Sequence, residues 1–102
     1  AEKYIGTTYV HTRDIWDAQT LDHIVIEGYY ENRDKAKPGN LTLKYPENGS
    51  LGLLKVVSDP NLTANVYQEF MDMTSAKIYT RSLVAGTWSQ WKYRDLDTLT
   101  IA

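Results

Sequence analysis

Residues 51–94 read LGLLKVVSDPNLTANVYQEFMDMTSAKIYTRSLVAGTWSQWKYR, and this segment indicates the architecture of the chain. Its apolar side chains are β-branched, aliphatic or aromatic, and much of it alternates with the period of two that is typical of strands. The predicted strands are residues 51–58, 66–72, 77–83 and 88–94. Short connections at residues 73–76 and 84–87 join the last three, which predicts an antiparallel meander.

The first half of the chain is less regular. Residues 14–22 carry apolar side chains among acids, and this pattern is compatible with a short helix capped by Thr12 or Asp14. Residues 24–30 resemble a strand, and residues 41–45 resemble a short edge strand. The expected fold class is therefore mainly β, as a small α+β domain: an antiparallel β-meander in a sandwich-like arrangement with a short N-terminal helix.

The length of 102 residues predicts a single domain, because one core typically serves about 100–150 residues. Residues 1–13 are rich in Thr and Tyr and are expected to be an extended arm or linker. Residues 14–94 form the domain proper, and residues 95–102 are expected to be a linker or the start of a next module. The chain does not begin with Met, so we expect it to be excised from a longer protein.

The composition makes several function classes improbable. With 42% hydrophobic and 24% charged residues, the chain is expected to fold alone. Its net charge is −2 and no basic block exists, so we expect no nucleic-acid partner. The apolar runs are too short to cross a bilayer, so no membrane insertion is expected. The absence of cysteine excludes disulfides and thiolate chemistry.

Motifs for catalysis or metal binding are missing. His11 and His23 have carboxylates near them in the sequence, but no serine lies in a G-x-S-x-G elbow. Glu69 and Asp72 form a carboxylate pair without a recognisable glycosidase context. No calcium loop surrounds the remaining candidate ligands, Asp14, Asp17, Asp95 and Asp97. We therefore expect no enzyme activity, no catalytic residue, no cofactor and no metal.

The aromatic residues near the C-terminus suggest a different chemistry. The chain has eight Tyr and three Trp against a single Phe, and Trp88 and Trp91 lie three residues apart. On a regular strand they would face opposite sides, one towards the core and one towards solvent. An exposed indole beside Tyr79, Arg81 or Gln90 could hold a sugar through ring stacking and hydrogen bonds. The interpretation we favour, however, is that both tryptophans fill the core or a subunit contact.

These residues also carry a resemblance to a known family. The matching segments extend from Leu21 to Tyr93 and are Leu21-Asp22, IEGYY (26–30), YPENG (45–49), LGLLKV (51–56), YQEF (67–70), IYTR (78–81) and GTWSQW (86–91). Together they resemble the knob domain that recurs in tail fibres and tailspikes of bacteriophages and in fibres of R-type pyocins. Residues 36–38 depart from the commonest pattern, which leaves the geometry of that loop open.

The resemblance implies a small β-rich module with minor helix and no chemistry of its own. It also implies an extracellular place on the virion, in a tail fibre or tailspike, and a homotrimer that adjoins other fibre domains. The expected role is structural, or receptor binding to bacterial surface polysaccharide, or both. A carbohydrate-binding module of a polysaccharide-degrading enzyme is the alternative hypothesis.

Overall fold

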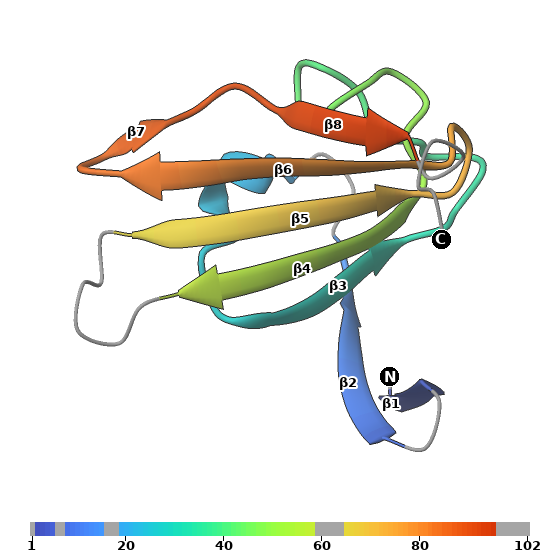
Figure 1. Cartoon of the computed structure of the whole chain (residues 1–102). Coiled ribbons are helices and arrows are strands. Elements are labelled where there is room, and N and C mark those ends of the chain that lie inside the picture. The colour runs from blue at the N-terminus through green and yellow to red at the C-terminus, as the bar shows by residue number, and fades with distance from the viewer. Residues whose placement is uncertain (1, 6–7, 16–18, 59–64, 96–102) are drawn as a thin grey trace, which may run out of the picture.

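A computed structural model describes residues 2–5, 8–15, 19–58 and 65–95 (Figure 1). The elements of this part of the chain are β1 (Glu2–Ile5), β2 (Thr8–Asp14), the 3₁₀ turn η1 (Leu21–His23), β3 (Gly28–Asn32), β4 (Gly52–Ser58), β5 (Val66–Asp72), β6 (Lys77–Val84), β7 (Thr87–Trp88) and β8 (Lys92–Asp95). They form one sheet in the order β1 to β7, and β8 pairs with β6 beyond the end of β7.

The predicted antiparallel meander is present as β5, β6 and the two short strands β7 and β8, which both pair with β6. β4 and β3 continue the antiparallel pairing on the other side of β5. Strands β3 to β6 pair with their neighbours in sequence, and β5 spans the residues that the alternation predicted. The predicted turn at residues 73–76 follows β5, where the carboxylate of Asp72 accepts hydrogen bonds from the N–H groups of Thr74 and Ser75. The mainly β fold class is confirmed.

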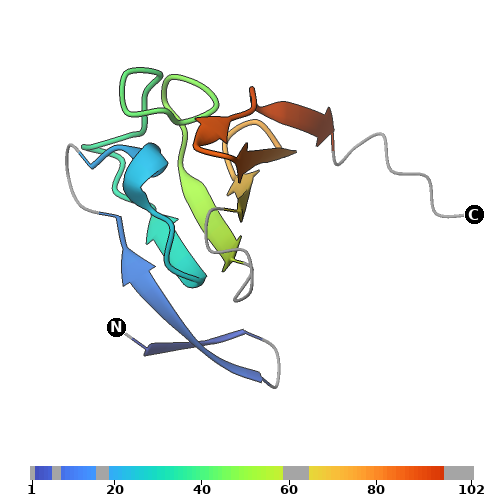
Figure 2. The ribbon, with the colours of Figure 1, turned by 90° about the vertical axis from the view of Figure 1, so that its left-hand side faces the viewer.

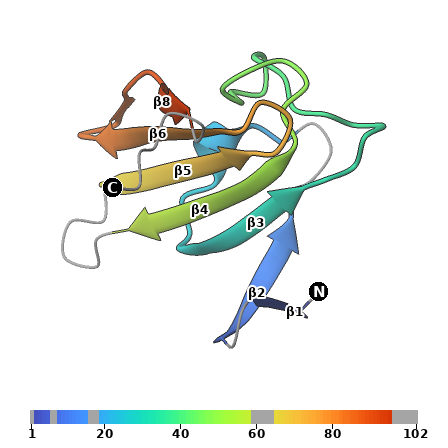
Figure 3. The ribbon, with the colours of Figure 1, turned by 45° about the vertical axis from the view of Figure 1, so that its right-hand side comes forward.

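The N-terminal strands extend the sheet in a way that the sequence did not indicate. β1 and β2 form an antiparallel hairpin that projects beyond the end of β3 (Figure 3). The last residues of β2, Thr12 to Asp14, pair in parallel with β3. The predicted arm is therefore a hairpin in its described residues, and β2 continues across the predicted boundary between residues 13 and 14. The division into arm, domain and linker remains a prediction.

The prediction of a short N-terminal helix over residues 14–22 is wrong for the described residues of that segment. Asp14 is the last residue of β2, and η1 is a single 3₁₀ turn. The N-cap of this turn is Thr20, so the predicted caps Thr12 and Asp14 do not cap it. Residues 16–18 lie outside the described residues. No helix in the described ranges is long and apolar enough to cross a bilayer.

The reason for the short turn is its place in the tertiary structure. The backbone carbonyls of Leu21 and Ile24 both accept hydrogen bonds from the side chain of Gln68, at 2.7 and 2.9 Å. In a longer α-helix these carbonyls would be used by the helix itself. The Leu21 carbonyl also accepts the N–H of Ile24 within the turn at 3.2 Å, so contact with the sheet adds a second hydrogen bond at Leu21 and satisfies the carbonyl of Ile24.

Two further predicted elements differ from the structure. The strand predicted over residues 24–30 begins only at Gly28 and continues to Asn32. The edge strand predicted over residues 41–45 is a turn, in which Asn40 caps the N–H of Leu43 and Lys44 has a positive φ of 66°. These local hydrogen bonds compete with strand pairing.

The core lies on one face of the sheet, which we call the inner face. Its centre includes Leu54, Val56 and Phe70, which are fully or almost fully buried. η1 and the segment 33–50 cover this face, and η1 lies behind the sheet in Figure 1 and beside it in Figure 2. The ring of Tyr45 meets Phe70 edge-on, with 5.6 Å between ring centres. This layer of turns and loops takes the place of the second sheet that a sandwich would have.

The opposite face of the meander, which we call the outer face, carries side chains that are mostly half-buried. In β5 the burial alternates strictly, because Val66, Gln68 and Phe70 point inward while Tyr67 and Glu69 point outward. The outer face therefore remains accessible across β4, β5 and β6 in the described part of the chain.

Candidate functional site

Arg81 is the centre of the predicted glycan-contact residues, and it lies on the inner face of β6. Its register partner on β5 is Gln68, whose side-chain oxygen accepts a 2.8 Å hydrogen bond from Arg81 Nε. Arg81 Nη1 donates at 2.8 Å to the carboxylate of Asp22 in η1. Because Gln68 also binds the backbone of η1, the three side chains join this turn to the sheet.

Both tryptophans lie against the guanidinium of Arg81. Its Cζ is 4.0 Å from the centre of the Trp88 ring and 4.6 Å from that of Trp91. Trp91 also donates from its indole N–H to the carbonyl of Lys44 at 2.9 Å. The two rings thus pack on the same cation and against the core.

Trp88 and Trp91 therefore do not face opposite sides as they would on a regular strand, and both pack against the core, which agrees with the favoured interpretation. The predicted strand over residues 88–94 is interrupted, since β7 ends at Trp88 and β8 begins at Lys92. The alternation of a regular strand does not continue through residues 89–91, and the irregular backbone brings the second indole back to Arg81.

The electrostatics of Arg81 follow from its burial. Only 6% of the residue is exposed, and burial lowers the pKa of its guanidinium, whereas the Asp22 carboxylate raises it. Arginine keeps its proton at neutral pH because its ordinary pKa is so high. Its Nη2 is buried without a hydrogen-bond partner among the described residues, and the two indole rings that lie over the guanidinium carbon contribute cation–π stabilisation.

Of the other two predicted contact residues, Tyr79 is buried and Gln90 is exposed. Tyr79 is 3% exposed, and its ring lies 5.5 Å from that of Tyr93. Burial raises the pKa of the Tyr79 hydroxyl, and the carboxylate of Glu47 raises it further. Gln90 lies exposed between β7 and β8. The accessible part of the candidate site is thus Gln90 with the outer parts of Trp88 and Trp91, and we call these three residues the Trp patch.

The sequence analysis did not identify Gln68 and Asp22, the two residues that hydrogen-bond to Arg81. Gln68 gave a usable signal, because the alternation in residues 66–72 places it on the same face as Val66 and Phe70, and a polar residue on an apolar face needs a partner. Asp22 gave none, because it is 59 residues away from Arg81 in the chain.

The carboxylates weighed for catalysis do not converge. Glu69 is on the outer face and accepts a hydrogen bond from the Tyr67 hydroxyl, whereas Asp72 is buried on the inner face with Ser50. His23 is exposed. In the described part of the chain no three acidic, His or Cys side chains are grouped as a metal site would require.

Comparisons with known proteins agree with this architecture. No family model matches the chain, and no curated protein matches it. Among solved structures, the chain is similar to a C-terminal fragment of the R2 pyocin fibre of P. aeruginosa, with 22% identity over 83% of the chain and a TM-score of 0.65. It is also similar to an N-truncated R2-type pyocin tail fibre, with 20% identity over 90% of the chain and a TM-score of 0.66.

The likeness covers only part of those proteins, because the chain spans 22% and 34% of their lengths. At these identities the comparison establishes the fold. The chain therefore has the fold of a domain that occurs in R2-type pyocin tail fibres.

Proposed function

We propose that the chain is a knob module of a phage or pyocin-type tail fibre, placed outside the cell on the particle, and that it contacts saccharide on the bacterial surface. The observation that carries this proposal is the similarity to R2 pyocin fibre structures, which extends over most of the chain. This role needs no catalytic group and no cofactor.

The Trp patch supports a glycan contact of modest affinity. Gln90 offers an exposed amide, and the indoles beside it are held in place by the buried Arg81. A sugar could stack its C–H groups on an indole edge and hydrogen-bond to the amide. Because Arg81 and Tyr79 are buried, neither contacts the sugar in this proposal, and Arg81 supports the indoles.

Homotrimerisation is part of the proposal, because it removes the need for a deep pocket. Three weak sites on one fibre act together through their effective concentration, which raises avidity by a factor of about 10² to 10⁴. Partners along the fibre would then be two further copies of this chain and the adjoining fibre domains.

The test is binding of the domain to an array of bacterial surface saccharides, with the domain fused to a trimeric coiled coil. We expect binding to one class of saccharide and much weaker binding by the unfused monomer. Analytical ultracentrifugation of the unfused chain measures whether it trimerises alone.

The variant Gln90→Ala is the matched probe of the Trp patch. Its side chain has no hydrogen-bond partner among the described residues, so we expect unchanged melting temperature and reduced binding. Lys92→Ala, at a neighbouring exposed position, is the control and should bind normally. A folded trimer that binds no saccharide on the array or on cells would overturn receptor binding and leave the module a spacer.

A further inference from the structure

Lys44 is an exposed cation beside the Trp patch. Its backbone carbonyl accepts a hydrogen bond from the indole N–H of Trp91 at 2.9 Å, and its side chain lies in solvent. The ammonium group is carried on a flexible aliphatic stem that begins at this contact. It can therefore reach a ligand that lies on the exposed part of the Trp91 ring.

The turn that contains Lys44 holds it in this place. The side-chain oxygen of Asn40 accepts the N–H of Leu43 at 2.9 Å, and the backbone carbonyl of Asn40 accepts the N–H of Tyr45 at 3.1 Å. On either side of Lys44, Leu43 packs against the core and Tyr45 is buried. The two inward neighbours anchor the backbone of the lysine and leave its side chain in solvent.

The backbone conformation of Lys44 is unfavourable for a residue with a side chain. Its φ is 66°, in the left-handed region that glycine adopts at lower cost. The other described non-glycine residues with positive φ, Ala76 and Ala85, lie in the turns that begin and end β6. A strained, charged residue that borders a candidate site and is not required by a hairpin points to a role for its side chain.

The charge of Lys44 has no partner of opposite sign. It forms no ion pair and no cation–π contact with another described residue. Asp22 is balanced by Arg81, and Glu47, the nearest carboxylate in the chain, hydrogen-bonds with the hydroxyl of Tyr79. Lys44 therefore offers an unpaired positive charge at the Trp patch.

The other lysine near Trp91 in the chain belongs to a different face. Lys92 pairs with Thr80, which lies between the inward-facing Tyr79 and Arg81. Because side chains alternate along a strand, Thr80 and its partner face outward. Lys44, and not Lys92, is therefore the lysine on the side of the Trp patch.

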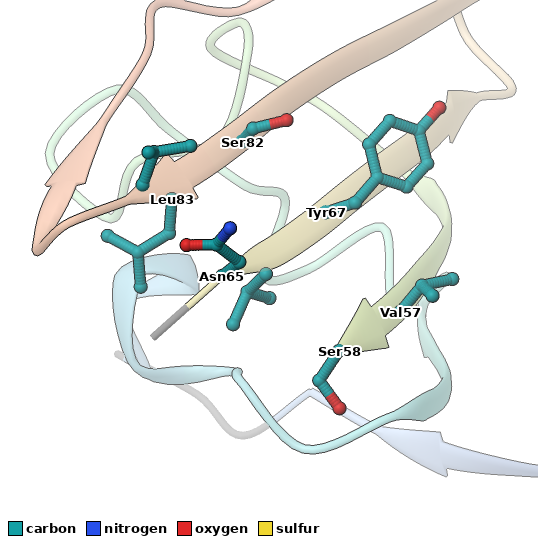
Figure 4. Close-up of a pocket in the computed structure, with 8 residues that line it drawn as sticks. Val57, Ser58, Asn65, Tyr67, Ser82 and Leu83 are labelled. Carbon is teal, nitrogen blue, oxygen red and sulfur yellow. The ribbon is translucent and has the colours of Figure 1, made fainter. Parts of the chain in front are cut away.

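A hollow at the ends of β4 and β6 differs from the Trp patch in charge (Figure 4). Its volume is about 420 Å³, and the described side chains that line it include no charged one. An anion there would lose its hydration without gaining a cation. An acidic ligand therefore fits the Trp patch better than this hollow.

We propose that the Trp patch binds an acidic saccharide, such as a uronic acid unit, and that the ammonium of Lys44 donates hydrogen bonds to its carboxylate. The sugar ring stacks on the exposed indole surface, and the amide of Gln90 hydrogen-bonds to the hydroxyls. This inference rests on the proposed function, to which it adds a ligand class and a further contact residue.

The experiment is an NMR titration of the isotope-labelled chain with methyl β-glucuronide and methyl β-glucoside. The two probes share one ring and differ only in whether the exocyclic carbon is a carboxylate or a hydroxymethyl group. We expect shift changes at the Trp91 indole N–H and the Gln90 amide, and a Kd about fivefold lower for the glucuronide, which corresponds to one exposed ion pair. High salt should remove this preference, because exposed charges are screened.

Variants of Lys44 test the assignment. Lys44→Gln should remove the preference for the glucuronide and leave binding of the glucoside unchanged. Lys35→Gln is the matched control, because Lys35 is exposed in the same segment 33–50 and the same change of charge there should keep the preference. Lys44→Gly should also lose the preference, with an unchanged or raised melting temperature, because glycine favours a φ of 66°.

The outcomes separate this inference from the proposed function. Equal affinities for the two glycosides, no shift with either, or equal effects of Lys44→Gln and Lys35→Gln would each overturn the inference. Binding of the trimeric fusion to neutral saccharides alone would also overturn it and would leave the proposed function intact. Failure of the proposed function is a different result, in which the folded trimeric fusion binds no saccharide at all.

Discussion

Replacing Arg81 with Met should lower the free energy of unfolding by about 3–5 kcal/mol, because one partner is removed from a buried ionic network. Met keeps much of the side-chain volume and can pack on both indoles, so the change removes mainly charge and hydrogen bonds. The buried side-chain oxygen of Gln68 loses its 2.8 Å donor, and an unsatisfied buried acceptor costs about 1–3 kcal/mol.

The remaining loss comes from the other contacts of Arg81. Two cation–π contacts disappear, each worth about 0.5–2 kcal/mol depending on how far it is desolvated. The side chain of Asp22 is 30% exposed, so water can solvate its carboxylate after the change and this part of the loss is small. Asp22→Asn, which keeps an oxygen for Arg81, should therefore cost only about 1 kcal/mol.

The assay is equilibrium unfolding in urea, followed by tryptophan fluorescence, to which the two indoles that contact Arg81 contribute together with Trp16. The double variant Arg81→Met with Asp22→Asn completes a double-mutant cycle that gives the coupling energy of the pair. A loss below about 1 kcal/mol for Arg81→Met would refute the reasoning, because it would mean that desolvation of the guanidinium cancels its contacts.

Three further predictions concern the inner face and its cover. Gly39→Ala should destabilise the fold by about 1–3 kcal/mol in thermal melts, because a Cβ there would lie 2.2 Å from the Tyr45 ring. Gly49→Ala should cost about 1 kcal/mol. A Cβ at Gly49 would have no neighbour within contact distance, but the φ of +85° is unfavourable for alanine. Phe70→Ala should cost about 3–5 kcal/mol in urea unfolding because Phe70 is fully buried, and an unchanged stability would contradict the placement of the core. Stability should fall as the pH rises above 10, because the folded state holds the Tyr79 proton that the unfolded chain releases there. Melting temperatures of the wild type and Tyr79→Phe across that range test this, since the variant should show a smaller decrease.

Much of the meander could be predicted from the sequence because its determinants are local. In residues 66–72 each side chain is inward or outward according to its position alone, so the period of two specifies both the strand and its buried face. The turn at residues 73–76 depends on Asp72 and its immediate neighbours. The aromatic residues of the candidate site were also identified from the sequence, although not their arrangement.

The arrangement of that site was decided by contacts between distant parts of the chain. Trp91 packs on Arg81 because the backbone after Trp88 is irregular and no longer follows the strand. Its indole N–H donates to the carbonyl of Lys44, which is 47 residues earlier in the chain. Asp22 reaches Arg81 only because the sheet brings η1 beneath β6. The pairing of β2 with β3 is parallel and has no local signal at all.

The sequence by itself therefore determined the central strands β4, β5 and β6, the buried face of β5, and which residues are candidates for contact with a glycan. Only the tertiary structure decided that Arg81 and Tyr79 are buried and that both tryptophans share one cation. The physical reason is that alternation depends on neighbouring residues, whereas burial, ion pairing and concave surfaces depend on which distant segments the topology brings together.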